Sequence, residues 1–360
     1  MMPVEARVAG ADTVRVMICD DSVVMRAAIA RAFEADPTIR IVARVADGKQ
    51  ALAEVRRQPI DVLVLDIEMP VMDGLTALPL LMRAAPRLRV LMVSTLTTRG
   101  AEVTLQALRL GAADYVAKPS AIAGQNAELF RRELLDRVRA LASRPARPSG
   151  ARTTAVVPAR PRLGPAALPR LLAIGSSTGG PQALLALFAA LGRTVPVPVI
   201  VTQHMPAAFT PILAQHITRA GGLPCAEAVD GEMLLSGRIY LAPGDRHLLI
   251  ERDAAGARAR LSTAPAVNFC RPSVDPMLES AAASFDGRVL VVMLTGMGSD
   301  GLEGTRRVIE AGGAAIAQDE ASSVVWGMPG AVAQAGLCQA VLPLSAIAPR
   351  LREVLRIAAQ

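Results

Sequence analysis

Residues 14–22 read VRVMICDDS, a short apolar run typical of a buried β-strand that passes directly into two aspartates and a serine. Outward from this stretch, apolar runs alternate with amphipathic segments whose apolar residues recur at three-to-four spacing, as far as about residue 142. Alternating β and α units of this kind predict a doubly wound parallel sheet. The further apolar runs lie at residues 39–45, 60–65, 89–93 and 114–116.

A proline-rich segment follows this first pattern, with six prolines between residues 145 and 169. Because proline lacks a backbone donor and is excluded from helix interiors, the segment is predicted to be an extended, flexible linker. A second α/β pattern begins at residue 171. Its apolar runs lie at 171–174, 197–201, 238–241, 289–294 and 314–317, and its helical segments include 181–191 and 301–311.

The chain of 360 residues is too long for one ordinary hydrophobic core. We predict two doubly wound α/β domains: a flavodoxin-like domain over 14–135 and a Rossmann-like parallel-sheet domain over 170–358. Residues 136–169 are then a helix end and the Pro/Arg-rich linker. No apolar run reaches the roughly 20 residues that cross a bilayer, and the first residues lack a secretory signal. We therefore expect a cytoplasmic protein without direct membrane insertion.

The composition argues against two kinds of partner. The excess positive charge, which gives the formal charge of +7, lies in residues 136–170, with 8 basic and 1 acidic side chains. The flanking parts are nearly neutral: residues 1–135 hold 17 basic and 16 acidic side chains, and residues 171–360 hold 14 basic and 15 acidic ones. With only 2% aromatic residues, neither domain is predicted to bind nucleic acid. The four cysteines form no C-x-x-C pair and are interpreted as buried thiols, and the three histidines are too widely spaced to predict a zinc site.

Carboxylates follow two of the predicted strands in the first domain. Asp20 and Asp21 end the first strand, and Asp66 ends the third. If these strands are neighbours, the three carboxylates converge at one sheet edge, where their mutual repulsion favours a hard cation such as Mg²⁺. Each aspartate alone could instead be a helix N-cap or a solvated loop residue.

Two further strand ends complete the parts needed for phosphoryl transfer. The fourth strand ends at Ser94, and the fifth leads to Lys118, one of only two lysines among 39 basic residues. A carboxylate nucleophile, a metal ion, an ammonium and a hydroxyl are the groups that take a phosphoryl group onto Asp66. The combination therefore favours a phosphorylated aspartate over four unrelated polar residues.

Residues 14–135 closely resemble the receiver domain of two-component response regulators. By this resemblance Asp66 is the phosphoacceptor, a histidine kinase is the phosphodonor, and Lys118 contacts the phosphoryl group. The resemblance also implies Mg²⁺ as the cofactor and a pair of switch residues. The implied magnesium ligands are Asp20, Asp21, Asp66 and the backbone carbonyl of Glu68, and the implied switch pair is Ser94 and Tyr115.

The second domain opens with a strand that runs into GSSTGG, residues 175–180. Glycines on both sides permit a sharp strand-to-helix turn that presents Ser177, the central serine of a G-x-S-x-G spacing, at a helix N-terminus. Two later strands lead to His204 and, through a glycine-rich loop, to Asp300. These three strand ends predict a triad in which His204 is the base for Ser177 and Asp300 fixes its tautomer.

Each of these signals also has a structural interpretation: a small-residue turn, a strand-end histidine, an N-capping aspartate. A phosphate-binding loop is disfavoured because neither G-x-G-x-x-G nor G-x-x-x-x-G-K-[ST] is present. The chain order Ser, His, Asp also differs from the Ser, Asp, His order of α/β-hydrolases.

Segments 173–180, 203–206 and 294–301 are similar to the motifs of the chemotaxis protein-glutamate methylesterase family, and the resemblance covers both domains in their order. It implies an enzyme that demethylates glutamyl esters of chemoreceptors, deamidates certain receptor glutamines, uses no cofactor in the esterase domain and is recruited to receptor arrays. It further implies the Met297 amide as an oxyanion donor and Thr178 beside the nucleophile. Ser176 stands where the family usually has alanine, which creates a rival hydroxyl.

Two other functions stay open from the residues alone. One is a receiver whose second domain binds DNA or another protein without catalysis. The other is a small-molecule esterase fused to a receiver. Labelling by a serine-reactive fluorophosphonate would separate the first from an esterase, and methanol release from methylated receptors would separate the second.

Overall fold

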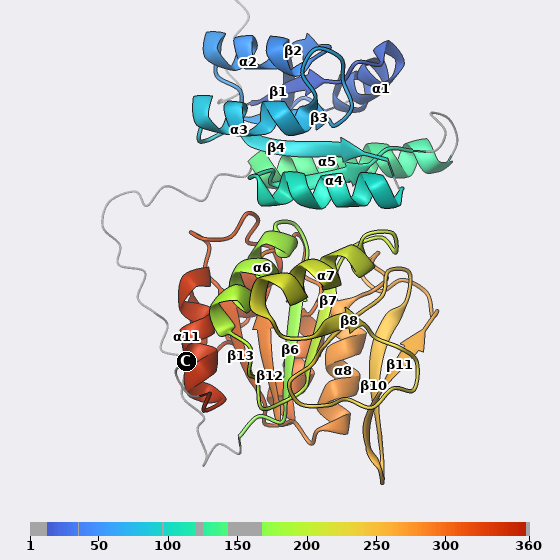
Figure 1. Ribbon diagram of the computed structural model, residues 1–360, viewed down its shortest axis with the longest axis vertical. Helices are drawn as coiled ribbons and strands as arrows, with labels where there is room; N and C mark the ends of the chain where they lie inside the picture. The colour runs from blue at the N-terminus through green and yellow to red at the C-terminus, as the bar shows by residue number, and fades with distance from the viewer. Residues whose placement is uncertain (1–12, 35, 96, 120–124, 143–167, 358–360) are drawn as a thin grey trace, which may run out of the picture. The chain divides into compact units, whose positions relative to one another are not determined.

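The structure is a computed structural model that describes residues 13–34, 36–95, 97–119, 125–142 and 168–357. Within these residues the chain forms two compact units, each a layered α/β fold, which confirms the predicted fold class (Figure 1). The predicted linker lies almost entirely outside the described residues.

The first unit has a five-stranded parallel sheet in the order β2-β1-β3-β4-β5. Helix α1 packs against α5, and α2 against α3. The strands agree closely with the apolar runs, although β3 begins two residues later than predicted. The elements are β1 (Val14–Cys19), α1 (Val23–Glu34), β2 (Ile39–Val45), α2 (Gly48–Arg57), β3 (Val62–Asp66), α3 (Gly74–Ala84), β4 (Arg89–Ser94), α4 (Thr98–Arg109), β5 (Asp114–Ala117) and α5 (Gln125–Ala142).

The second unit is built on a seven-stranded sheet in the order β14-β13-β12-β6-β7-β9-β8, in which every strand pair is parallel. The elements are β6 (Leu171–Ser176), α6 (Gly180–Leu191), β7 (Val199–Gln203), α7 (Thr210–Gly221), β8 (Cys225–Glu227), β9 (Ile239–Leu241), β10 (His247–Asp253), β11 (Gly256–Ser262), α8 (Val274–Ser284), β12 (Val289–Met293), α9 (Leu302–Glu310), β13 (Ala314–Gln318), α10 (Met328–Gln334), β14 (Ala340–Leu342) and α11 (Leu344–Val354).

In each sheet the strand order reverses at a point that lies beside the predicted site residues. In the first unit the reversal falls between β1 and β3, and in the second between β6 and β12. All four of these strands are buried along most or all of their length, as expected for strands covered on both faces. In open α/β sheets, ligands bind beyond the carboxyl ends of the strands at such a reversal.

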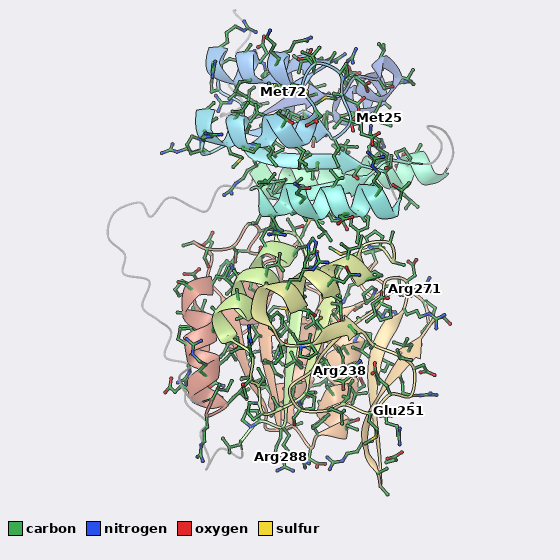
Figure 2. All side chains as sticks on the ribbon, viewed as in Figure 1. Met25, Met72, Arg238, Glu251, Arg271 and Arg288 are labelled. Carbon is green, nitrogen blue, oxygen red and sulfur yellow. The ribbon has the colours of Figure 1, made fainter. Side chains whose placement is uncertain are left out.

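Four strands of the second unit were not predicted. Strands β10 and β11 pair as an antiparallel hairpin separate from the main sheet, and β8 and β14 are three-residue edge strands. The hairpin carries surface ion pairs such as Arg260 to Glu251, 3.1 Å apart, so its sequence lacks a continuous apolar run; Figure 2 shows Glu251 on its outer side. Among the described residues no helix is both long and apolar enough to cross a membrane.

Candidate active site and acidic pocket

The three carboxylates of the first unit converge as predicted, because β1 and β3 are neighbours in the sheet. One carboxylate oxygen from each of Asp20, Asp21 and Asp66 lies within 4.8 Å of the other two. The Asp20 Oδ2 atom is buried and accepts no hydrogen bond from any residue that the structure describes, although the Lys118 ammonium is 3.3 Å away. A buried carboxylate oxygen without a donor is suited to a cation, and ligands on opposite sides of Mg²⁺ are about 4 Å apart. The pocket therefore fits this ion.

Lys118 is joined to this cluster by its side chain. Its Nζ atom lies 2.7 Å from Asp66 Oδ2, and the Ile67 amide donates to Asp66 Oδ1 at 2.7 Å. Burial raises the pKa of Asp66 to about 6, even though the Lys118 hydrogen bond lowers it. Burial lowers the pKa of Lys118, but its contacts with Asp66 and Asp20 outweigh this effect and raise it, so the ammonium stays charged. The pocket thus combines one cation with three acids.

The remaining receiver residues are Ser94, Tyr115 and Glu68. Ser94 is buried at the end of β4, and Tyr115 is buried on β5, beneath the Arg137 guanidinium, which lies 5.8 Å from the ring centroid. Burial raises the pKa of the Tyr115 phenol. The Glu68 side chain is exposed, in the loop that follows β3. The role of its carbonyl as a metal ligand stays a prediction.

In the second unit, Ser177 occupies a sharp turn between β6 and α6. Helix α6 has Gly179 as its N-cap, with a φ of 75° that favours glycine, and Pro181 in its first turn. The Ser177 amide donates to the Thr295 carbonyl at 3.0 Å, and the side chain is 8% exposed. The hydroxyl is therefore held at the amino end of a helix, where the dipole favours developing negative charge.

The neighbouring Ser176 has a different environment. It is the last residue of β6, it is fully buried, and its hydroxyl donates to Gln203 Oε1 at 2.7 Å. The Gln203 amide in turn donates to the carbonyls of Ser177, at 3.0 Å, and His204, at 3.1 Å. Ser176 therefore helps to position the Gln203 side chain, whose hydrogen bonds fix the backbone of two candidate catalytic residues, Ser177 and His204.

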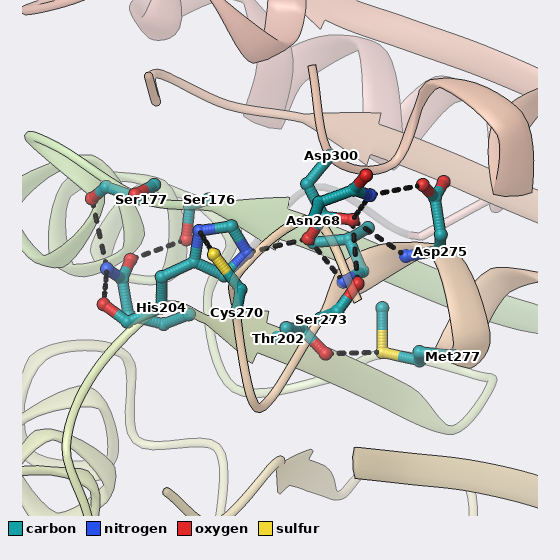
Figure 3. Close-up of polar contacts among 12 residues, drawn as sticks. Ser176, Ser177, Thr202, His204, Asn268, Cys270, Ser273, Asp275, Met277 and Asp300 are labelled. Carbon is teal, nitrogen blue, oxygen red and sulfur yellow. Dashed lines mark hydrogen bonds and ion pairs between the residues drawn. The ribbon is translucent and has the colours of Figure 1, made fainter. Parts of the chain in front are cut away.

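His204 and Asp300 are in direct contact. His204 Nε2 lies 2.7 Å from Asp300 Oδ2, and in Figure 3 the imidazole lies between Ser177 and Asp300. No hydrogen bond joins the Ser177 hydroxyl to His204 among the residues that the structure describes. Hydrogen bonds of this kind are often long before substrate binds. Because Asp300 holds Nε2, the ring nitrogen left for Ser177 is Nδ1, which in this structure contacts the Cys270 sulfur at 3.5 Å.

Asp300 is held by donors from the start of α8. Its Oδ2 also accepts the Val274 amide at 2.7 Å, and its Oδ1 accepts the Ser273 hydroxyl at 2.7 Å and the Asn268 side-chain amide at 2.8 Å. Burial would raise the pKa of Asp300, but the hydrogen bonds from His204, Val274 and Ser273 hold it well below its usual range. The carboxylate is therefore ionised and fixed in place.

The sequence analysis did not identify three neighbours of the triad: Asn268, Ser273 and Cys270. The interpretation of all four cysteines as buried thiols is wrong for Cys270, which is half-buried with its Sγ atom 3.5 Å from His204 Nδ1; Cys225 is also half-buried. Ser273 is the N-cap of α8, and a serine before a helical pattern was the one sequence signal that could have marked this segment.

The glycine-rich loop after β12 comes very close to Ser177. A Cβ atom built on Gly296 would lie 2.9 Å from Ser177 Cβ, so only glycine fits at this position. The next residue, Met297, is half-buried, and its amide donates no hydrogen bond to any described residue. Thr178 is buried, and its carbonyl accepts the Thr295 hydroxyl at 2.9 Å. The loop thus brings a free backbone donor into the neighbourhood of the hydroxyl.

Comparisons with known proteins show the family to which the chain belongs. A family model described as CheB methylesterase matches residues 172–351, and one described as response regulator receiver domain matches residues 16–127. A protein-glutamate methylesterase/protein-glutamine glutaminase of Azospirillum brasilense is 51% identical over 96% of this chain and 93% of its own length. The chain belongs to the protein-glutamate methylesterase family. A relative of the same name from Rhodospirillum centenum is 50% identical, over 96% of this chain and 95% of its own length.

The solved structures include a matching catalytic unit. The CheB methylesterase catalytic domain of Thermotoga maritima is 38% identical, with a TM-score of 0.51, and the match covers 52% of this chain and 100% of that one. Family membership therefore rests on both sequence and fold, and it extends over both units of the chain.

The His204 environment leads to a prediction about pH. Burial lowers the pKa of His204, but its hydrogen bond to the Asp300 carboxylate and its contact with Cys270 outweigh this effect and raise the pKa to about 9. Since only neutral imidazole can take a proton from Ser177, kcat/KM for ester hydrolysis should rise about tenfold per pH unit below this pKa. We expect Cys270→Ala to shift this rise of kcat/KM to lower pH, because one cause of the raised His204 pKa is removed.

The matched control is Cys225→Ala, which removes the other half-buried thiol. Full pH profiles of the wild type and both variants provide the measurement. If the rise of kcat/KM in Cys270→Ala occurred at the same pH as in the wild type, the thiol would have no influence on the pKa of the imidazole.

Proposed function

We propose that this chain hydrolyses the γ-methyl esters of glutamates on methyl-accepting chemoreceptors and deamidates certain receptor glutamines, under control of phosphorylation at its receiver domain. The observation that carries the proposal is the 2.7 Å contact between His204 Nε2 and an ionised Asp300, at the sheet edge where Ser177 lies in the turn that leads into α6. The relatives that match nearly the whole chain bear the names of the same two activities.

The triad residues have separate roles in this reaction. The Ser177 oxygen attacks the ester carbonyl carbon while its proton passes to His204 Nδ1. Asp300 stabilises the imidazolium that forms and keeps the ring oriented. The imidazolium then gives the proton to the leaving methoxide, which departs as methanol, or to the leaving amine when the substrate is glutamine. Water, activated by the same imidazole, releases the glutamate from Ser177.

The developing oxyanion needs donors that point at it from the outset. We assign this role to the Met297 backbone amide, which has no other acceptor among the described residues and follows directly on the glycine that touches Ser177. Thr178 follows Ser177 in the same turn, and we assign it a place beside the nucleophile. No cofactor enters the esterase chemistry, because the three side chains and the backbone supply every proton transfer that it requires.

Two measurements test the catalytic proposal. Methanol should be released from membranes that contain methylated chemoreceptors, and a fluorophosphonate should label Ser177. A chain that is labelled but acts only on simple esters would be a small-molecule esterase. A chain that is not labelled, with Ser177 intact, would be a receiver-controlled binding protein without catalysis.

The receiver pocket supports phosphoryl transfer to Asp66. We assign Asp20, Asp21, Asp66 and the carbonyl of Glu68 as the Mg²⁺ ligands; when bound, this ion neutralises charge on the phosphoryl oxygens. Asp66 supplies the accepting oxygen, and Lys118, already 2.7 Å from it, pairs with the new phosphoryl charge. The phosphodonor is a histidine kinase of the receptor pathway, and the chain acts in the cytoplasm at receptor arrays.

The added charge is the proposed switch. Ser94 and Tyr115 lie on the two strands beyond β3, and movement of these side chains toward the phosphoryl group would reshape the receiver surface. The unphosphorylated receiver then restricts access to the esterase site, and phosphorylation favours the accessible form by differential stability.

Asp66→Asn provides the direct test. Incubation of the wild type with Mg²⁺ and acetyl phosphate should phosphorylate the chain and raise methanol release, and the variant should show neither effect because the acceptor oxygen is replaced by an amide. Asp61→Asn, at the other end of the same strand, is the matched control and should respond as the wild type does. Phosphorylation that persists in Asp66→Asn would place the acceptor elsewhere.

A further inference from the structure

One phenylalanine differs from all the others in the chain. Five of the six phenylalanines are buried, whereas Phe269 is 96% exposed. Scattered exposed apolar side chains are common on protein surfaces and need no special cause. Phe269 is unusual because its backbone is also in an unfavourable conformation and because its neighbours touch the triad.

The backbone around Phe269 forms a tight two-residue turn. Val267 and Cys270 exchange both backbone hydrogen bonds, at 3.1 and 2.9 Å, and the two central residues, Asn268 and Phe269, have φ values of 53° and 62°. Positive φ at both positions is the type I′ pattern, in which asparagine is favoured first and glycine second. Phenylalanine therefore occupies the position that glycine fits best, and its side chain gains no burial in return.

The residues on either side of Phe269 both reach the active site. The Asn268 amide donates to Asp300 Oδ1 and to Asp275 Oδ2, each at 2.8 Å, and the Cys270 sulfur lies 3.5 Å from His204 Nδ1. The turn is thus fixed to the triad at both ends while its tip projects into solvent. Figure 2 shows the next residue, Arg271, toward the carboxyl-end edge of the sheet, away from Arg288, which precedes β12.

We propose that Phe269 is a specificity-determining residue that inserts into an apolar surface of the protein substrate beside the glutamate being hydrolysed. This inference rests on the proposed function and names the feature of the substrate that the site selects: a folded protein segment with an apolar surface next to its glutamyl ester. An aromatic side chain has only two rotatable bonds, so at the edge of a site it contributes contact area at little cost in entropy. A small ester binds only at the triad and has no atoms that could contact Phe269.

The test compares Phe269→Gly with the wild type as full-length phosphorylated chains on two substrates. On methylated chemoreceptors in membranes, kcat/KM should fall about tenfold or more, mainly through KM, the loss typical of one aromatic anchor. On N-acetylglutamate γ-methyl ester it should stay within about twofold, because Phe269 takes no part in the chemistry. The melting temperature should not decrease, since glycine suits the positive φ and no buried contact is lost.

Val229→Ala is the control for removal of an exposed apolar side chain, since Val229 is 61% exposed in the same unit and has no contact with the triad. Equal losses on both substrates, or no loss on either, would overturn the proposal. A rise in small-ester hydrolysis by unphosphorylated Phe269→Gly would overturn it in favour of contact with the chain's own receiver. A wild type that hydrolyses the small ester but releases no methanol from receptors would instead refute the proposed function.

Discussion

Replacing Ser177 by alanine is expected to lower kcat for ester hydrolysis by about a million-fold, the loss seen when a nucleophile is removed from a triad that acts as a unit. The loss is large because His204 and Asp300 assist only the transfer of the serine proton, and the adjacent Ser176 hydroxyl is held by Gln203 Oε1. Methanol release from methylated receptors under saturating substrate gives kcat directly. Fluorophosphonate labelling should disappear in parallel.

Ser176→Ala is the matched control, because it removes the adjacent hydroxyl of the same type. Its hydroxyl is fully buried and donates to Gln203 Oε1, so the variant should lose about 1–3 kcal/mol of folding stability and keep activity within about tenfold. A loss of kcat as large as that of Ser177→Ala, in a variant that is still folded, would contradict the assignment of the nucleophile.

Asp300→Asn is expected to lower kcat about ten-thousand-fold while the protein remains folded. Asp300 Oδ2 accepts the Val274 amide and His204 Nε2, and its Oδ1 accepts the Ser273 hydroxyl. An asparagine side chain has only one accepting oxygen. Whichever way its amide group is turned, its NH₂ group therefore faces other hydrogen-bond donors, and hydrogen bonds are lost. If the NH₂ faces His204, the imidazole must turn or change tautomer, and Nδ1 then carries the proton that it should accept.

The control for this substitution is Asp319→Asn. Asp319 follows β13 at the same edge of the sheet and accepts hydrogen bonds from the Ser322 amide and hydroxyl, with no contact to His204. Its kcat should stay near that of the wild type. If Asp300→Asn retained more than about a tenth of the activity, the carboxylate would be a capping group for α8 rather than part of the triad.

The main sheets and the positions of the candidate residues could be predicted because the buried parallel strands are nearly continuous apolar runs. Where such a run stops at a polar residue, the residue must lie at the carboxyl edge of the sheet, and this places Asp20, Asp66, Ser177 and His204 correctly. Asp300 lies seven residues beyond the end of β12, yet its glycine-rich loop indicated the same edge.

The residues that surround the triad could not be predicted in the same way. Asn268 and Cys270 are in a turn that has no apolar period, and their contacts join positions 32 and 66 residues apart in the sequence. The antiparallel hairpin was missed because alternating small and charged residues, such as those of β11, resemble a solvated loop when the partner strand is unknown. Both failures concern features that depend on packing partners rather than on local sequence.

The ion pairs of Lys118 have a practical consequence for chemical labelling. Active esters modify uncharged amines, and Lys118 is held as an ammonium by Asp66 and Asp20. The chain has one other lysine, Lys49, which is exposed on α2. Amine-directed reagents should therefore attach to Lys49 and spare Lys118, so that a dye or a surface tether can be placed at one lysine side chain while the phosphoryl pocket stays chemically intact.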